Sequence, residues 1–262
     1  MFSKILIAHD LTTEANQALR RAAQLARQFD AQLVIAHALN DGDAVHAETT
    51  LQGVRADIGA PQAQILVRPG KPAEVLLHAV TDVGADLVVT GTHHAGRPEA
   101  LSGSNLERVA RECPVPMLMV RDLPTAPYRH ALVALDESAC AARALQVAYQ
   151  LLPSDGRLDG IHIIDEALQL PPELRRQQRD EQLAGLNDLA RKALAGLEGG
   201  PQPTIDVQPG TLAGSLDTQI RLLAPQLLVL GQHGRSRLSE VLLGSLPAYY
   251  LRQPLCDLLL VK

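Results

Sequence analysis

Short apolar runs alternate with longer segments of helical periodicity along the chain. KILIAHD (4–10) and QLVIAHALN (32–40) begin as buried strands and end in polar residues. Between them lies TTEANQALRRAAQLARQF (12–29), whose Ala and Leu residues recur at helical spacing after Thr residues that can cap a helix. Strands that alternate with helices in this way predict right-handed crossovers and a parallel sheet covered by helices.

The same order of elements occurs twice. KILIAHD (4–10) matches HALVALD (130–136), an apolar strand that ends in Asp. ADLVVTG (85–91) matches PQLLVLG (225–231), an apolar strand that ends in Gly. Such internal similarity indicates two copies of one structural unit.

Two domains follow from this repeat. The Pro-rich segment DLPTAPYRH (122–130) is the predicted linker, so the first domain spans residues 1–124 and the second residues 128–262. Each is predicted to be a doubly wound α/β domain with a five-stranded parallel sheet flanked by helices. In such a sheet a ligand binds beyond the carboxyl ends of the strands, where the strand order reverses. The residues that directly follow the strands are therefore the candidates for a site.

The second repeat contains an extra segment. The spacing between the repeats grows from 126 residues at Asp136 to 140 residues at Gly231, and the added residues lie between Asp165 and Thr204. The apolar residues of this segment share one helical stripe: Leu183, Leu186, Leu189, Ala190 and Leu194. We expect a longer amphipathic helix packed on its own sheet, with a protein-binding face as the alternative.

Composition narrows the class of protein. Hydrophobic residues make up 46% of the 262 residues but aromatic residues only 2%, so Leu, Val, Ile and Ala must build the core, as in parallel sheets covered by helices. A net charge of −5 argues against a nucleic-acid-binding surface, which needs clustered Lys and Arg. No apolar run is long enough for a transmembrane helix, and a strand begins where a signal peptide would. Cys113, Cys140 and Cys256 are odd in number and far apart, which fits a reducing cytoplasm better than a disulfide framework.

The strongest functional signal is the loop GQHGRSRLSEVLLGS (231–245), which follows an apolar strand. The free N–H groups and positive dipole end of the helix that follows can bind an anion, and glycines let the backbone approach a phosphate without a Cβ in the way. Ser245 can cap this helix or donate its hydroxyl to a phosphate oxygen. Asp136 ends the first strand of the same repeat, where its carboxylate can accept hydrogen bonds from a ribose or an adenine. These residues predict a nucleotide site; the alternative is that the glycines only shape a turn and that Ser104 and Ser245 only cap helices.

Two other nucleotide motifs do not fit. No Gly-Lys-Ser/Thr follows the glycines, and a GxGxxG motif would follow the first strand, where the chain reads ALDES (134–138). The sequence instead resembles the universal stress protein family, over nearly its whole length and as two tandem copies. The motif of that family is Gly, two residues, Gly, nine residues and Gly-Ser/Thr, and residues 231–245 match it at every fixed position.

The resemblance implies that the second repeat binds ATP. The motif would hold the ribose and phosphates, Asp136 would contact the adenosine, and Ile163 would hold the adenine through backbone hydrogen bonds. The implied nucleotide-binding residues are Ala134, Asp136, Ile163, Gly231, His233, Gly234, Gly244, Ser245 and Leu246. Leu246 would supply an N–H that faces the phosphates. Pro247 departs from the family pattern and removes one phosphate donor, although proline is tolerated in the first turn of a helix.

The equivalent loop of the first repeat, GTHHAGRPEALSGS (91–104), departs further from the motif. His94 stands where the second glycine should be, and the closing Gly-Ser arrives one residue early. Arg97 and Pro98 stiffen the shortened loop. A weaker site would use Asp10, Gly91, Gly103 and Ser104. We therefore expect nucleotide binding mainly in the second repeat.

Histidines and carboxylates offer no clear metal or catalytic site. His37, near the end of the second strand, could join His93 and His94 in a zinc site, but exposed or core-edge histidines are the default, and no metal site is predicted. Asp136 and Asp165 could hold Mg²⁺ through waters. Neither a Ser–His–Asp order nor a close carboxylate pair is evident, so no catalytic residue is predicted and any ATP hydrolysis would be slow.

The sequence as a whole predicts a cytoplasmic tandem universal stress protein that binds ATP, with Mg²⁺ as its companion ion, and that supports stress survival or regulates an unknown protein partner. The resemblance implies strand order 3-2-1-4-5 in each repeat. It also implies that the last strands, VPMLMV (115–120) and CDLLLV (256–261), pair between the repeats, with a homodimer as a further arrangement. A protein-interaction scaffold with vestigial pockets is the alternative function. An ATP-dependent ligase or nucleotidyl transferase would need a Ser-Gly-Gly-x-Asp run after the first strand, which AHDLTTE and ALDESAC lack.

Overall fold

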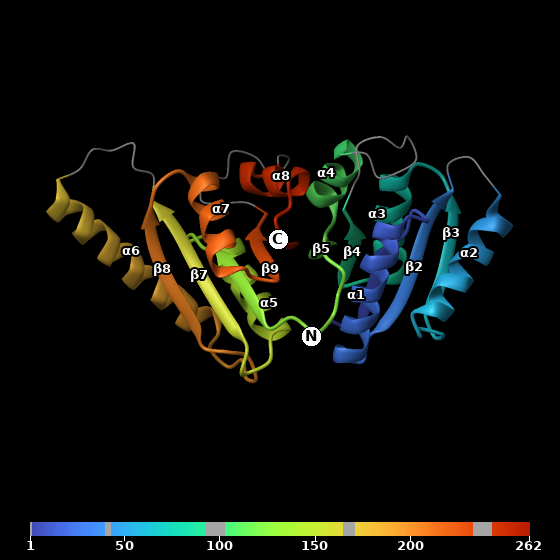
Figure 1. Cartoon of the computed structure of the whole chain (residues 1–262), viewed down its shortest axis with the longest axis horizontal. Helices are drawn as coiled ribbons and strands as arrows, with labels where there is room; N and C mark the ends of the chain where they lie inside the picture. The colour runs from blue at the N-terminus through green and yellow to red at the C-terminus, as the bar shows by residue number, and fades with distance from the viewer. Residues whose placement is uncertain (1, 40–42, 93–102, 165–170, 233–242) are drawn as a thin grey trace. The chain divides into compact units, whose positions relative to one another are not determined.

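The chain forms two compact units (Figure 1). The computed structural model describes residues 2–39, 43–92, 103–164, 171–232 and 243–262. Unit 1 holds Met1–Pro127 together with Ala248–Leu258, and unit 2 holds Tyr128–Pro247 together with Leu259–Lys262. The residues Ala248–Leu258, called the C-terminal segment below, therefore belong to the second repeat in sequence but to unit 1 in space.

Unit 1 alternates strands with helices, as the apolar pattern predicts. Its strands are β1 (Lys4–Ala8), β2 (Gln32–Leu39), β3 (Gln64–Pro69), β4 (Leu87–Gly91) and β5 (Met117–Val120). Its helices are α1 (Thr13–Phe29), α2 (Ala44–Asp57), α3 (Pro72–Val83) and α4 (Gly103–Glu112). The strands lie in the order β3-β2-β1-β4-β5, and each neighbouring pair is parallel. This is the predicted order 3-2-1-4-5.

The second repeat has the same sequence of elements. Its strands are β6 (His130–Ala134), β7 (Arg157–Ile164), β8 (Pro203–Pro209), β9 (Leu227–Gly231) and β10 (Asp257–Val261). Its helices are α5 (Ala139–Leu151), α6 (Pro172–Ala193), α7 (Leu212–Leu223) and α8 (Ser245–Arg252). Within unit 2 the strands β8-β7-β6-β9 lie side by side with parallel pairing, which repeats the order of the first four strands of unit 1.

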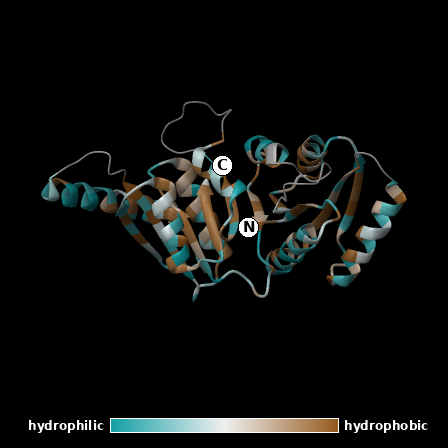
Figure 2. Ribbon diagram, turned by 45° about the horizontal axis from the view of Figure 1, so that its top comes forward, coloured by the Kyte–Doolittle hydropathy of each residue, from teal (hydrophilic) through white to brown (hydrophobic). Residues whose placement is uncertain are grey.

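The core of each unit is the sheet itself. Ile5, Leu6 and Ile7 of β1 are completely buried, and the four residues of β9 from Leu227 to Leu230 are buried as well. Figure 2 shows the strands as mostly hydrophobic and the helices as mixed, with polar residues on one side. Strands buried on both faces give continuous apolar runs, which is why the sequence pattern locates them well.

The extra segment of the second repeat forms the long helix α6, as predicted. It has 22 residues where the equivalent α2 has 14. Leu186 and Ala190 of the predicted apolar stripe are buried. Arg179 donates from Nε to the carbonyl of Val207 at 2.9 Å and pairs with Asp206, which ties α6 to β8. The helix therefore packs on its own unit.

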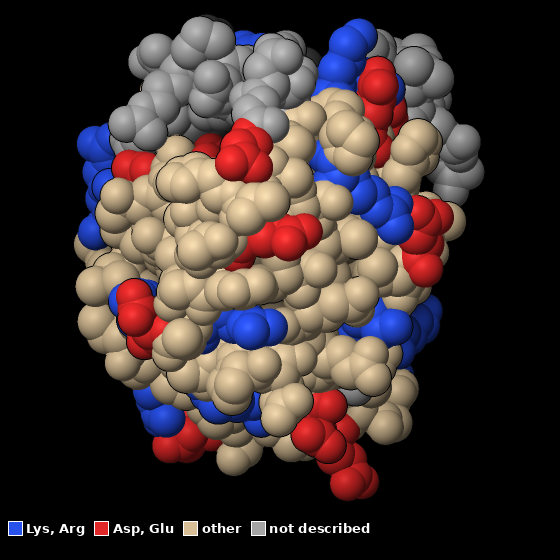
Figure 3. Space-filling view, turned by 90° about the vertical axis from the view of Figure 1, so that its right-hand side faces the viewer, with Lys and Arg blue, Asp and Glu red and all other residues tan. Residues whose placement is uncertain are grey.

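The surface carries mixed charges. On the face of the molecule in Figure 3, Lys and Arg side chains are interspersed with Asp and Glu side chains. A nucleic-acid-binding face needs a stripe of positive charge, and this face has none. Among the described residues, no helix combines the length and apolar character needed to cross a membrane.

Candidate functional site

The candidate residues of the second repeat gather at the carboxyl edge of three adjacent strands. β6 lies between β7 and β9, with Ala134 in register with Ile161 on one side and with Leu230 on the other. The chain leaves β6 through α5 to reach β7, whereas β9 lies on the opposite side of β6. This is the point where the strand order reverses, so Ala134, Asp136, Ile163 and Gly231 lie at the edge where doubly wound sheets bind ligands.

Asp136 shapes the turn that leads from β6 into α5. Its Oδ1 atom accepts a hydrogen bond from the N–H of Ser138 at 2.9 Å. Ser138 is the N-cap of α5, and its hydroxyl accepts from the N–H of Ala141 at 3.1 Å. The Asp136 side chain is only half-buried, so it combines this local role with access from the edge of the sheet.

Asp10 has the same local role in the first repeat. Its Oδ1 atom accepts from both the backbone N–H and the hydroxyl of Thr12, at 3.2 and 2.5 Å. Thr12 is the N-cap of α1 and accepts from the N–H of Ala15 at 3.2 Å. Each Asp is thus a turn-forming residue as well as a ligand candidate, a role that the sequence analysis did not predict.

Gly231 and Gly91 allow a close approach between a strand end and a helix start. A Cβ on Gly231 would lie 3.0 Å from Cβ of Cys140 and 3.2 Å from the backbone N of Ala141, in the first turn of α5. A Cβ on Gly91 would lie 2.9 Å from backbone atoms of Glu14, in the first turn of α1. Because the approach is the same in both repeats, these two glycines have a packing role that does not depend on a ligand.

The two ends of the glycine loop meet. The N–H of Gly244 donates to the carbonyl of Gln232 at 3.3 Å, and a Cβ on Gly244 would lie 3.0 Å from the same oxygen. Gln232 is itself buried. The loop therefore leaves β9 and returns to the same point before α8 begins at Ser245.

α8 begins with candidate phosphate donors. The Ser245 side chain is exposed, Leu246 is half-buried and Pro247 is buried. Pro247 lies in the first turn of α8 and, as a proline, has no N–H that could bind a phosphate. His233 and Gly234, the other candidates of this loop, lie outside the described residues.

The loop of the first repeat is described only at its ends. Gly91 closes β4, and Gly103 and Ser104 open α4. His94, the replacement that weakens the motif, lies outside the described residues. The comparison of the two loops therefore rests on their sequences.

His9 is a buried residue beside the first-repeat candidates that the sequence analysis missed. Only 3% of its surface is exposed. Burial lowers its pKa from 6.5 to about 4, against the smaller effect of a hydrogen bond from Nε2 to Asn16 Oδ1 at 3.0 Å. The N–H of Leu11 donates to its Nδ1 at 3.0 Å, so the neutral ring satisfies both nitrogens. Leu135 is its counterpart in the second repeat, which leaves no sequence signal for a shared role.

We expect His9 to make unit 1 sensitive to acid. The folded-state pKa of about 4 lies below the unfolded value of 6.5, so the unfolded chain binds the proton first and stability falls as the pH drops from 6.5 to 4. The loss attributable to His9 is roughly 3 kcal/mol between pH 7 and pH 4. Urea unfolding of the wild type and of His9→Leu at pH 7 and pH 4 measures this loss. On acidification the free energy of unfolding should fall by roughly 3 kcal/mol less in the variant than in the wild type. His46→Gln, at an exposed site on α2, is the control and should behave as the wild type does. Equal acid losses in the wild type and His9→Leu would contradict the assignment.

A second pair of histidines has matching contacts in the two repeats. His37 donates from Nδ1 to the carbonyl of His9, and His162 does the same to the carbonyl of Leu135, both at 2.7 Å. Each bond ties the second strand of a repeat to the end of the first strand, just before Asp10 or Asp136. The sequence signal for this shared contact is the histidine at the same place in AHALN (36–40) and IHIID (161–165).

The zinc alternative gains no support. Groups of three or more His, Cys, Asp or Glu side chains able to hold a metal ion are absent from the described residues. His37 is engaged with a backbone carbonyl. His93 and His94, the other members of the suggested zinc set, lie outside the described part of the chain. Asp165, a candidate for Mg²⁺ binding through water, lies outside it as well.

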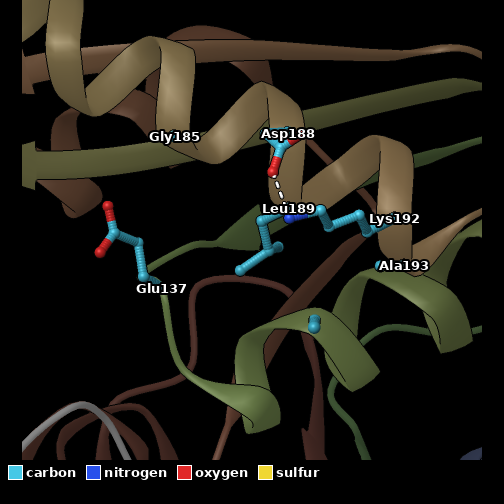
Figure 4. A pocket seen from close by; sticks show the side chains of 7 residues that line it. Glu137, Gly185, Asp188, Leu189, Lys192 and Ala193 are labelled. Atoms are coloured by element: carbon cyan, nitrogen blue, oxygen red, sulfur yellow. Dashed lines mark ion pairs between the residues drawn. The ribbon is translucent and has the colours of Figure 1, made fainter.

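A separate pocket lies between α5 and α6. It has a volume of about 440 Å³ and is lined by Glu137, Ala142, Gly185, Asp188, Leu189, Lys192 and Ala193. Figure 4 shows the Glu137 side chain directed toward α6 near Gly185, while Asp188 and Lys192 form an ion pair of 2.7 Å. None of the predicted nucleotide-binding residues lines this pocket, although Glu137 directly follows Asp136.

Comparison with known proteins agrees with the two-repeat architecture. A model of the universal stress protein family matches residues 1–121 and, separately, residues 127–262. A universal stress protein of Thermus aquaticus is 33% identical over 137 residues, which is 46% of this chain and 100% of that protein. Universal stress protein E of Salmonella typhi is 27% identical over 221 residues, 79% of this chain and 70% of that protein.

The fold also matches a solved structure. The crystal structure of a universal stress protein from Archaeoglobus fulgidus aligns with a TM-score of 0.67 over 99% of this chain and 98% of that one, at 19% sequence identity. At this identity the match shows the fold alone. The family model, in contrast, covers nearly the whole chain as two successive matches. The chain therefore belongs to the universal stress protein family, as a tandem of two family domains.

Proposed function

We propose that the protein binds an adenine nucleotide, ATP, at the carboxyl edge of β6, β7 and β9, and that it acts in a stress response. The observation that carries the proposal is the complete motif at residues 231–245, which begins at the last residue of β9 and ends at the first residue of α8. Family membership supports it, because the motif is the one that the resemblance assigns to ribose and phosphate binding.

The described residues fit a nucleotide in part. The exposed hydroxyl of Ser245 and the N–H of Leu246 stand at the start of α8, where backbone donors and the helix dipole favour a phosphate. The Gly244 N–H is already used by Gln232 and Pro247 has none, so fewer donors remain than a full helix start would offer. Phosphates held here would bring a bound Mg²⁺ with them. The cation would neutralise the part of the phosphate charge that the Ser245 hydroxyl and the Leu246 N–H do not compensate.

The other end of the nucleotide would meet Asp136 and Ile163. The Asp136 carboxylate would accept hydrogen bonds from the adenosine, while the backbone of Ile163 at the end of β7 would hold the adenine. Gly231 allows the end of β9 to lie close to the first turn of α5, and this approach would set the distance between the two halves of the proposed site.

The first repeat would bind poorly or not at all. His94 would place a Cβ and an imidazole beside the phosphates, and the shorter loop would move the closing Gly103 and Ser104. The proposal therefore assigns one nucleotide to each chain. We place the protein in the cytoplasm, where it would act with an unidentified protein partner. The location is supported by the three cysteines, none of which forms a disulfide among the described residues.

Calorimetric titration of the purified full chain with ATP and Mg²⁺ tests the proposal, with GTP as the control ligand. Saturable heat with ATP and much weaker heat with GTP is the expected result. A chain that takes up neither nucleotide would favour the scaffold with vestigial pockets, for which the Pro247 and His94 departures are the supporting observations.

A further inference from the structure

A buried carboxylate joins the C-terminal segment to the first repeat. Asp257, the first residue of β10, has 1% of its surface exposed. Its Oδ1 atom accepts from the N–H groups of Arg121 and Asp122, which directly follow β5, at 2.8 and 3.1 Å. Its Oδ2 atom lies 3.6 Å from Nε of Arg21 on α1. The two side chains of this ion pair are only 5% and 2% exposed.

Arg21 is held by more than this carboxylate. Its Nη1 atom donates to Oε1 of Gln24, one turn along α1, and to the carbonyl of Ala126 at 2.8 Å. A single guanidinium thus connects α1, the segment that links the two repeats and the C-terminal segment within unit 1. At the exposed edge of the same contact, Nε of Arg252 on α8 lies 2.7 Å from Oε1 of Glu107 on α4.

Comparison of the two repeats shows that only one pairing brings these two charges together, that of Arg21 in the first repeat with Asp257 in the second. The position equivalent to Arg21 in the second repeat is Val147, and the position equivalent to Asp257 in the first repeat is Pro116. Neither repeat carries both charges. A pair formed between two first repeats would leave Arg21 opposite a proline, and a pair between two second repeats would leave Asp257 opposite a valine.

We propose that Arg21 and the loop after β5 form a docking surface on the first repeat that selects the C-terminal segment of the second repeat through Asp257. A buried charge without its counter-charge is strongly unfavourable, so the two residues act against like-with-like pairing of the repeats as well as for the pairing seen in unit 1. The surface therefore requires a segment with a carboxylate at this position. The tandem chain supplies that segment itself, which fixes the partner of the first repeat as the second repeat.

The pairing is tested on the folded full chain after a single cut between the repeats. A protease site inserted after the exposed Leu123 allows the folded protein to be nicked, and dilution then measures how tightly the two pieces stay together. The nicked wild type should remain a one-to-one complex of unlike pieces. Asp257→Leu and Arg21→Val should each weaken the complex by about a hundredfold or more, because each removes one member of a buried ion pair.

The double variant separates a specific pair from two independent losses. Arg21→Val with Asp257→Leu should regain most of the lost affinity, and its pieces should also form complexes of like with like, which the wild type excludes. Asp257→Asn keeps an oxygen for the two N–H groups after β5 but removes the charge, so it should fold and still weaken the complex at least tenfold. Arg252→Ala, at the exposed edge, should change the affinity less than threefold, because exposed ion pairs contribute little.

Three results would overturn the proposal. The first is a wild-type affinity in Asp257→Asn, which would mean that backbone hydrogen bonds alone hold the segment. The second is a double variant no tighter than the weaker single variant. The third is a nicked wild type that rearranges into complexes of like pieces.

Discussion

Gly234→Val is expected to reduce ATP binding by about a hundredfold or more, a loss of at least about 2.7 kcal/mol of binding free energy. Gly234 is the second fixed glycine of the motif in the second repeat. If the proposed site is correct, a valine side chain at this position would crowd the phosphates, and it would restrict backbone angles that glycine adopts without strain. Calorimetry gives the affinity, and thermal unfolding of the same sample shows whether the fold is intact.

His94→Val is the matched control in the first repeat. It places the same side chain at the equivalent position of the other loop, so it should leave both the affinity and the number of ATP molecules bound unchanged. Normal ATP binding by Gly234→Val, or an equal loss in both variants, would place the nucleotide somewhere other than the loop at 231–245.

The second large effect concerns Asp136. If its carboxylate binds the adenosine, a hydrogen bond with one charged partner is lost in Asp136→Ala, and affinity should fall roughly ten- to a hundredfold. The substitution also removes the hydrogen bond from Ser138 N–H that supports the turn into α5, so a loss of about 1 kcal/mol in stability should accompany it. Calorimetry and urea unfolding separate the two effects.

Two variants distinguish a ligand contact from a turn contact. Asp136→Asn keeps an acceptor oxygen for Ser138 but removes the charge, so it should preserve stability and still weaken ATP binding. Asp10→Ala removes the equivalent turn contacts with Thr12 in the first repeat, so it should lower stability with little change in affinity. If Asp10→Ala and Asp136→Ala weaken ATP binding equally, Asp136 is only a turn-forming residue.

The fold was predictable because its determinants are local. Buried parallel strands give continuous apolar runs, and the helices between them have cap residues such as Thr12 and Ser138, so element order and the strand order of unit 1 follow from the pattern and the family resemblance. The division at the C-terminus was not predictable in the same way. The C-terminal segment forms its buried ion pair through Asp257 and Arg21. These two residues are far apart in sequence, and their counterparts, Pro116 and Val147, give no sign of a partner. The pairing of the last strands of the two repeats stays a prediction.

The candidate site could be located from the sequence only in outline, and its role in nucleotide binding stays a prediction. The spacing of glycines and the place of Asp136 after a strand identified the edge of the sheet, because strand ends and helix starts can be located from the sequence. The packing role of Gly91 and Gly231 against the first turn of a helix could not be separated from a ligand role, since both require the absence of a Cβ. The burial of His9 also escaped detection, because a lone histidine before an Asp has no pattern of its own.

The most direct test of the central claim is the number of ATP molecules that one full-length chain binds at saturation. The second repeat has the complete motif, and the first has His94 and a shortened loop, so calorimetric titration with ATP and Mg²⁺ should give one site per chain. Two equal sites would contradict the assigned difference between the repeats, and a chain that binds no ATP would contradict the nucleotide site itself.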